Sequence, residues 1–327
     1  MPSALQSVLF VFAGAGVLIA QPPSYDPALG GTVTGIVLDA NSRLRPVFGV
    51  PGASTLGPAI AIDAAIQVIA IAPYQDYVLG LQGDDRQLVI STLGASQPRL
   101  LATGIVSATL SPKGSSLLLL QQTGASAQVV SGLPSAAAVA WTADLSALPA
   151  PPSSIAISDD GTAVLAASPE GGNVSIFLVT AGGGPRIVAS VGQLAGLSFL
   201  PGTTDALLGD AQAGLVQLLR GLSDSASLTL VADSVAPVDV ASSHDGRRFY
   251  IASANPAGVI AVDRASGTQE LIACACNPTA LVRLGRSGVF RLTESSAGLF
   301  WLFDSAPTAR RIVWVPPDAP LTLEGVQ

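Results

Sequence analysis

A unit of four short β-rich runs recurs along the chain and constrains its fold more than any other feature. The two clearest copies have their runs at 154–157, 163–167, 173–179 and 186–190, and at 237–242, 248–252, 258–263 and 270–273. In both copies, a Ser-x-Asp-Gly turn joins the first two runs, and its Gly supplies the positive φ that a tight hairpin needs. Such a repeat predicts that each unit is one small sheet packed against its neighbours.

Weaker copies of the unit turn at 73–74, 111–114, 201–202 and 285–288. The turns recur every ~39 to 47 residues, which is the spacing of four-stranded propeller blades. Six complete units therefore extend from about residue 66 to about residue 316. We predict an all-β fold, a β-propeller of seven four-stranded blades, with six blades and an N-terminal addition as the alternative.

The seventh blade is expected to close the ring. Residues 32–39 and 45–50 align with the third and fourth strands of a unit, and no first and second strands precede them. A propeller removes exposed sheet edges when both chain ends contribute to one blade. Residues 58–63 and 321–323 are the candidates for the remaining strands.

The composition fits blades that are buried on both faces. Hydrophobic residues make up 49% of the chain, charged residues 11%, and the mean hydropathy is +0.54. Strands covered on both faces are continuous apolar runs, so a propeller accounts for this hydropathy without a membrane.

The N-terminus carries the longest apolar run, residues 8–20, which is shorter than the ~20 residues of a membrane span. It ends at Ala20, before Gln21-Pro22-Pro23, in the layout of a secretory signal peptide. An uncleaved anchor helix is the alternative. We predict a signal peptide at 1–20, a linker at 21–31 and a single propeller domain at 32–327. Export to the periplasm or the extracellular space follows, without membrane attachment once the signal is cleaved.

The charge argues against nucleic acid as a partner. The net charge is −7 and Lys113 is the only lysine, whereas a nucleic-acid binder carries a basic face. Arginines gather late in the chain. Arg283, Arg286 and Arg291, together with Glu294, form a weak candidate site for an anionic ligand, and a salt-bridged surface is the alternative reading.

The remaining reactive residues are few. Cys274 and Cys276 are the only cysteines, and an exported protein can join such a pair as a disulfide. Neighbours two apart in an extended strand lie ~6.7 Å apart with parallel side chains, so a bridge requires a bent backbone. Two small buried thiols are the equal alternative. His244, the only histidine, is expected to be a solvated turn residue, and we predict no metal and no cofactor.

The two clearest copies resemble the YVTN-type repeats of bacterial β-propellers, part of the broad WD40-like group. The resemblance covers most of the predicted mature chain, strongly at 150–273. Lactonase-type propellers of this kind imply several polar and His residues around the central channel, and this chain has one histidine. We therefore predict a non-catalytic binding or interaction scaffold for a protein, glycan or small ligand at one propeller face. A lactonase-like or other hydrolytic enzyme and a structural envelope protein are the alternatives.

Overall fold

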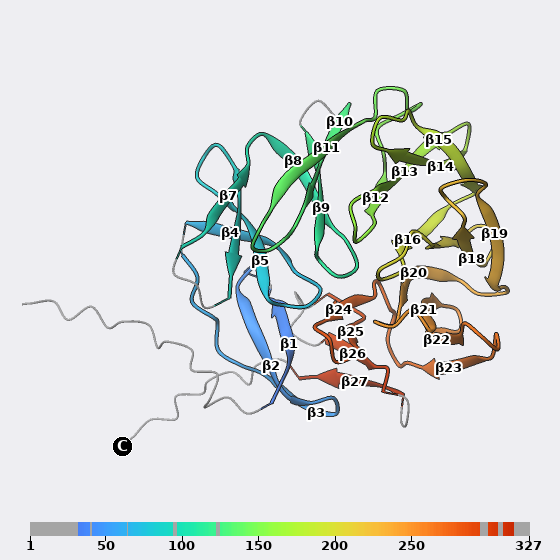
Figure 1. Ribbon diagram of the computed structural model, residues 1–327. Helices are drawn as coiled ribbons and strands as arrows, with labels where there is room; N and C mark the ends of the chain where they lie inside the picture. The colour runs from blue at the N-terminus through green and yellow to red at the C-terminus, as the bar shows by residue number, and fades with distance from the viewer. Residues whose placement is uncertain are drawn as a thin grey trace, which may run out of the picture.

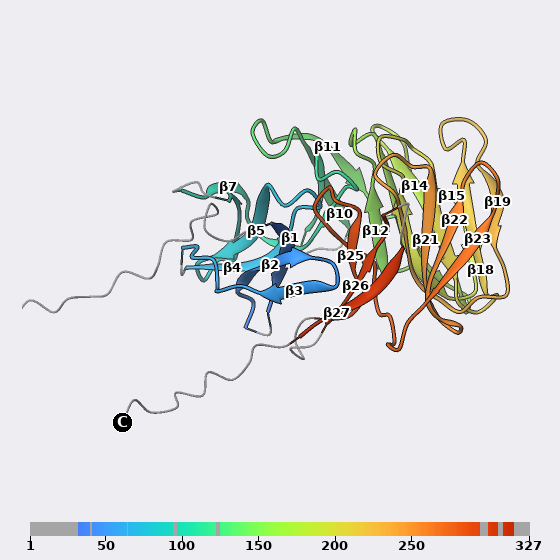
Figure 2. The same ribbon diagram turned by 90° about the horizontal axis from the view of Figure 1, so that it is seen from below.

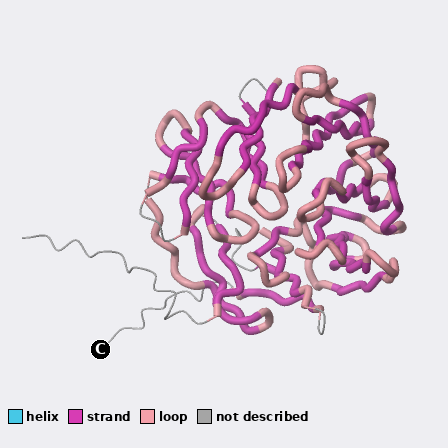
Figure 3. The backbone as a smooth tube through the Cα atoms, in the orientation of Figure 1, coloured by secondary structure: helices cyan, strands magenta, loops and turns pink. Residues whose placement is uncertain are grey.

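The computed structural model describes residues 32–39, 41–63, 65–93, 97–121, 125–294, 300–306 and 310–316, and these residues form strands and turns without a helix (Figure 3). They make seven antiparallel sheets, one of three strands and six of four, which we number as blades in chain order. The predicted signal peptide and linker lie outside the described residues, as do residues 317–327.

The strands of the first four blades have the following bounds. Blade 1 contains β1 (Val33–Leu38), β2 (Leu44–Val50) and β3 (Ala53–Leu56). Blade 2 contains β4 (Ile66–Ile71), β5 (Tyr77–Gln82), β6 (Gln87–Thr92) and β7 (Arg99–Ala102). Blade 3 contains β8 (Ile105–Leu110), β9 (Ser116–Gln121), β10 (Ser126–Ser131) and β11 (Ala138–Asp144). Blade 4 contains β12 (Ser154–Ile157), β13 (Ala163–Glu170), β14 (Asn173–Thr180) and β15 (Arg186–Val191).

The last three blades follow the same plan. Blade 5 contains β16 (Leu194–Phe199), β17 (Ala206–Asp210), β18 (Leu215–Arg220) and β19 (Ser227–Ala232). Blade 6 contains β20 (Pro237–Ser242), β21 (Arg248–Ala254), β22 (Ala257–Asp263) and β23 (Gln269–Ala273). Blade 7 contains β24 (Val282–Leu284), β25 (Val289–Arg291), β26 (Phe300–Asp304) and β27 (Arg311–Val315).

The blades form a ring around a central axis, as Figure 1 shows face-on and Figure 2 from below. First strands contact one another around much of this ring: β8 with β12, β12 with β16, β16 with β20, and β24 with β1. The predicted seven-bladed β-propeller is confirmed, and the six-bladed alternative is wrong.

The hydrophobic core is divided among the interfaces between blades. The described residues form seven clusters of buried side chains, and each cluster joins two neighbouring blades. The cluster between blades 4 and 5 holds thirteen buried residues, whereas the one between blades 1 and 2 holds three, Leu44, Val68 and Val78. Because both faces of a blade are buried, the chain needs more apolar residues than a sheet with one wet face.

The closing blade differs in detail from the sequence prediction. The expected third-strand segment is β1, which contacts the first strand β24, while β3 contacts the last strand β27. The N-terminal hairpin therefore occupies inner positions, because it begins at the axis and runs outward like every other blade. Residues 58–63 form no strand, and residues 321–323 lie outside the described part of the chain. The three described strands of this blade all come from the N-terminal part of the chain.

A glutamine side chain completes the joint between blades 1 and 2. The Gln75 amide accepts a hydrogen bond from the Ile36 backbone N–H at 2.7 Å and donates one to the Ile36 carbonyl at 2.8 Å. These are the two bonds that a neighbouring strand would make, so the side chain covers part of the β1 edge. Gln75 has φ +59, at the place in its turn where other blades carry Gly.

The repeated turn between the first and second strands has one hydrogen-bond pattern. In blade 4, the Ser158 hydroxyl donates to Asp160 at 2.6 Å and accepts from the Ala163 N–H at 3.0 Å. Blade 6 reproduces both bonds, from Ser243 to Asp245 at 2.6 Å and from the Arg248 N–H at 2.9 Å. The second residue of the turn takes no part in this pattern, so its side chain is free to serve other purposes.

Candidate functional site

The central channel contains a cavity of about 250 Å³. Its wall is made mainly of the first strands of blades 3 to 7 and of the turns after the first strands of blades 2, 3 and 5. Three prolines, each the second residue of its turn, line this cavity: Pro73, Pro112 and Pro201. Proline suits the place because its φ is fixed near that of a turn and it needs no hydrogen-bond acceptor.

Two oppositely charged side chains face this cavity from blades 6 and 7. Asp239 lies on β20, where its carboxylate accepts the N–H groups of Val240 at 2.8 Å and Leu281 at 2.7 Å. Burial raises the pKa of Asp239, and these two bonds act in the opposite direction. The guanidinium of Arg283 on β24 donates to the Ser242 carbonyl and lies over the Phe290 ring, with Cζ 4.7 Å from the ring centroid.

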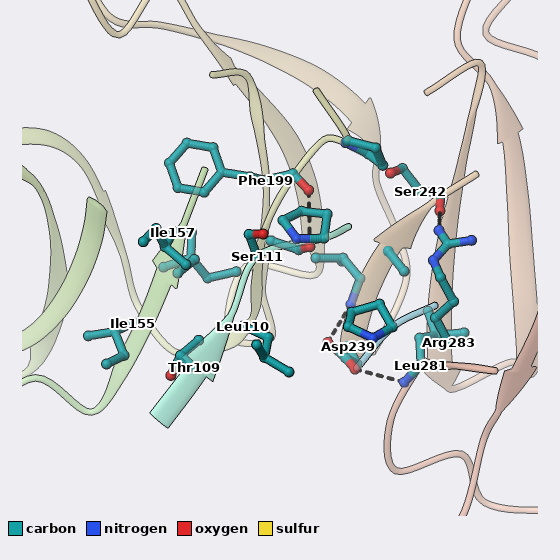
Figure 4. Close-up of a pocket in the computed structure, with 18 of the residues that line it drawn as sticks. Thr109, Leu110, Ser111, Ile155, Ile157, Phe199, Asp239, Ser242, Leu281 and Arg283 are labelled. Atoms are coloured by element: carbon teal, nitrogen blue, oxygen red, sulfur yellow. Dashed lines mark hydrogen bonds between the residues drawn. The ribbon is translucent and has the colours of Figure 1, made fainter. Parts of the chain in front are cut away.

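Arg283 is held without a carboxylate partner among the described residues, and its Nη1 is buried without a hydrogen bond there. Burial lowers the pKa of Arg283, while the charge of Asp159 acts in the opposite direction. Figure 4 shows the guanidinium of Arg283 directed toward Ser242 rather than toward Asp239. Each of the two half-buried charged groups therefore bonds to backbone groups instead of to the other.

Above the cavity, turn residues from distant blades meet at the mouth of the channel. The Tyr74 hydroxyl and Nδ1 of His244 form a 2.7 Å hydrogen bond between the turns of blades 2 and 6, and their rings make an edge contact with centroids 5.3 Å apart. The guanidinium of Arg286 lies over the Tyr74 ring, with Cζ 4.3 Å from the centroid. Burial raises the pKa of Tyr74, whereas Arg283 and Arg286 lower it. His244 is exposed, as predicted, but it is bound to a partner across the mouth.

Asp159, the second residue of its turn in blade 4, links three blades at the same face. Its carboxylate accepts the Lys113 N–H of blade 3 and the Gly202 N–H of blade 5, each at 2.7 Å. The Asp159 carbonyl also accepts the hydroxyls of Ser115 at 2.6 Å and Ser116 at 2.9 Å. This aspartate fixes the rim of the channel.

A second hollow, of about 550 Å³, lies beside the mouth between blades 6 and 7. Three arginines line it, together with two aspartates and a histidine: Arg247, Arg248, Arg286, Asp245, Asp263 and His244. Arg247 is 3.8 Å from Asp245, an exposed pair worth little in stability. No hydrogen bond to another described residue is seen for the guanidinium groups of Arg248 and Arg286. This arginine groove can therefore offer N–H donors to an anion.

The three candidate arginines of the β24–β25 hairpin face different parts of the molecule. Arg283 faces the channel and Arg286 the arginine groove, but Arg291 forms a 2.8 Å ion pair with Glu294 away from both. The physical reason is register: Arg283 is opposite Phe290 and Arg291 is opposite Val282, so the two arginines project from opposite faces of the blade. Arg291 and Glu294 thus match the alternative reading, a salt bridge.

Cys274 and Cys276 form a disulfide, with their Cα atoms 5.1 Å apart. This separation is shorter than that of an extended chain, because the backbone bends directly after β23 ends at Ala273. A disulfide between two cysteines that are two residues apart requires such a bend, because an extended strand would hold them too far apart.

The residues that sequence reasoning missed are Tyr74, Asp159 and Asp239. Tyr74 and Asp159 belong to the repeated turn, and their place in it was the available indication. Asp239 lies within the apolar run of a first strand, where a lone carboxylate indicates a special environment. Within the described ranges, no group of three His, Cys, Asp or Glu side chains is placed to hold a metal ion. No helix in the described part of the chain is long and apolar enough to cross a membrane.

The chain has the fold of a seven-bladed β-propeller. No protein-family model matches it, and no curated protein matches its sequence. A structurally similar protein is a functionally unknown one from Desulfotomaculum acetoxidans DSM 771, with a TM-score of 0.53 and 15% identity over 86% of this chain and 98% of that one.

Two other solved structures have the same likeness. The β-propeller domain of Cps50 (Swd1) from Myceliophteria thermophila has a TM-score of 0.52 and 13% identity over 79% of this chain and 88% of that one. Dihydro-heme d1 dehydrogenase NirN in complex with DHE has a TM-score of 0.52 and 15% identity over 77% of this chain and 56% of that one. At these identities the likeness shows the fold alone. The more specific YVTN-type resemblance stays a prediction.

Proposed function

We propose that this chain is an exported, non-catalytic binding propeller that recognises anionic groups of a partner through the arginine groove beside the channel mouth. The observation that carries the proposal is that three arginines line that groove: Arg247, Arg248 and Arg286. A guanidinium presents a planar fork of donors that matches a carboxylate or a phosphate. Asp245 and Asp263 also line the groove, and their carboxylates are bonded within their own turns.

The anion-binding part of the proposal is tested with citrate, a small tricarboxylate, by isothermal titration calorimetry at low salt. We expect binding that weakens as salt is raised, and that falls about tenfold in Arg286→Gln, which corresponds to ~1.4 kcal/mol. Arg86→Gln is the matched control, because Arg86 is an exposed arginine in the β5–β6 turn of blade 2 and does not line the groove. Equal affinities in the wild type, Arg286→Gln and Arg86→Gln would refute a role for the groove.

Export rests on the N-terminal sequence. The full chain, including residues 1–31, is expressed in a bacterial host and its periplasmic fraction is analysed by mass spectrometry. The expected species begins at Gln21, after removal of residues 1–20. Recovery of the intact N-terminus in the cytoplasm would contradict export.

Hydrolytic activity is the second candidate function, because Asp239 faces the channel and burial raises the pKa of this carboxyl. A carboxyl with a perturbed pKa in a cavity is a candidate acid or base. A channel lined only by apolar side chains would have excluded an enzyme. Arg283 also lines this channel, so its wall carries two charged side chains. A panel of lactones and esters separates the two functions: turnover that is lost in Asp239→Asn would replace the binding proposal.

A further inference from the structure

The cavity in the channel presents an electrostatic anomaly that the arginine groove does not explain. Asp239 and Arg283 both line it, both are half-buried, and neither forms an ion pair with a described residue, although the charge of Asp159 acts on Arg283 at longer range. Burial of a charged group without an opposite charge is costly, because the lost hydration is replaced only in part by backbone dipoles. A ligand that carries both signs of charge would compensate the two groups at once.

The donors and acceptors that remain are suited to such a ligand. Arg283 uses Nη2 for the Ser242 carbonyl and leaves Nη1 buried without a bond, so a guanidinium that turns toward the cavity has a donor to give to a carboxylate there. Asp239 holds one backbone N–H on each oxygen. A carboxylate has about four lone-pair sites, so it can still accept a bond from an ammonium group.

The rest of the wall and the volume specify the ligand further. Leu110, Ile155 and Leu197 line the cavity and are only half-buried by the protein, so an apolar group can pack against them. At ~30 Å³ per water molecule, the cavity of about 250 Å³ has room for roughly eight water-sized groups. An amino acid about the size of leucine matches this volume.

We propose that the central channel binds a free α-amino acid with an apolar side chain, its carboxylate at Arg283 and its ammonium at Asp239. This site is separate from the arginine groove and does not depend on the function proposed there. The side chain packs against the apolar wall formed by the first strands of blades 3 to 5.

The test uses L-leucine and two analogues that each lack one charge, with binding measured by isothermal titration calorimetry on the full propeller. 4-Methylpentanoate keeps the carboxylate without the ammonium, and leucinol keeps the ammonium without the carboxylate. We expect each analogue to bind about tenfold more weakly than leucine or worse, because a buried polar group would be left unpaired. If 4-methylpentanoate binds as tightly as leucine, the proposal that the ligand carries both charges is wrong. If none of the three compounds binds, the proposed site itself is wrong.

Variants assign the two ends of the ligand. Arg283→Met and Asp239→Asn are each expected to abolish leucine binding, whereas Arg291→Met is the matched control, because Arg291 pairs with Glu294 outside the channel. Circular dichroism verifies that each variant folds. If the channel variants do not fold, a crystal soaked with L-selenomethionine gives an independent answer: an anomalous selenium peak in the channel supports the site, and its absence refutes it. Loss of citrate binding at the groove would leave these outcomes unchanged.

Discussion

The joint between blades 1 and 2 offers a sharp test of how this ring closes. Replacing Gln75 by Ala removes both side-chain hydrogen bonds to Ile36. A neutral hydrogen bond contributes ~1 kcal/mol, and a partly buried group left unpaired costs more, so we expect a loss of about 2–3 kcal/mol. Among the described residues, the cluster at this joint has three fully buried residues, fewer than at any other joint, and the hydrophobic residues packed around them are only partly buried.

Two measurements report on this prediction. Thermal unfolding should shift downward by several degrees, at ~2–4 °C per kcal/mol for a large domain. Hydrogen exchange resolves the cause, because the Ile36 amide should lose protection while amides within blades 4 and 5 keep theirs. A change below ~0.5 kcal/mol together with unchanged protection of the Ile36 amide would refute the closure by Gln75.

Gln75→Glu isolates the hydrogen bonds from side-chain volume. An ionised carboxylate can accept from the Ile36 N–H but cannot donate to the Ile36 carbonyl, so at pH 7 this variant should be at least as unstable as Gln75→Ala. Protonation restores a donor, so the folded state raises the pKa of the introduced Glu above its ordinary value of ~4.3. The stability of Gln75→Glu relative to the wild type should therefore rise as the pH falls toward ~4.3 and level off below it. A stability difference between Gln75→Glu and the wild type that does not change with pH would contradict the paired hydrogen bonds.

Three further predictions concern the turns and strand ends. Asp159→Ala should lower the free energy of unfolding in urea by about 2–3 kcal/mol, because two backbone N–H groups of neighbouring blades lose their acceptor. The control Asp85→Ala, in an exposed turn, should lower it by less than ~0.5 kcal/mol. Equal losses would argue against the rim contacts. Burial acts to raise the pKa of Asp210, but four backbone N–H bonds outweigh it and hold the pKa below its ordinary value. The resulting stability is present above pH ~4 and is lost as the pH falls through the folded pKa. The urea midpoints of the wild type and Asp210→Asn should therefore differ at pH 7 and converge in acid. Gly161→Ala should destabilise the protein more than Gly83→Ala, although both glycines have φ +69 and share ~1 kcal/mol of backbone strain on substitution. A Cβ at Gly161 would lie 3.2 Å from the Ser116 hydroxyl, whereas one at Gly83 would meet nothing within 4 Å. Equal melting temperatures of the two variants would contradict this packing.

The sequence was informative about the blades because their determinants are local. Ser158 and Ser243 form their turn bonds within five residues, so the pattern is visible in any one copy. The position of the N-terminal hairpin was predicted less well. Its place in a blade depends on the contact of β1 with β24, which joins the two ends of the chain and leaves no local trace.

The candidate site was harder to predict for the same reason. Arg283 and Arg291 are close in sequence but project to opposite faces of a blade, whereas Tyr74 and His244 are 170 residues apart and share a hydrogen bond. Asp239 is one carboxylate among apolar neighbours, and only the packing of blade 7 against blade 6 places it in the same cavity as Arg283. Sequence repeats therefore specify the scaffold, and the convergence of unlike repeats specifies the site.

The repeated turn has a consequence for how such a chain can change. Its first and third residues hold the backbone in blades 4 and 6, while its second residue is Asp159 in one and His244 in the other. Proline occupies the equivalent position in blades 2, 3 and 5. The ring thus carries a circle of exchangeable positions around one opening, each separated from the interactions that fold its blade. Randomising these positions, with Asp159 retained because its carboxylate bonds to the two neighbouring blades, would yield a library of receptors with new specificities on the same scaffold.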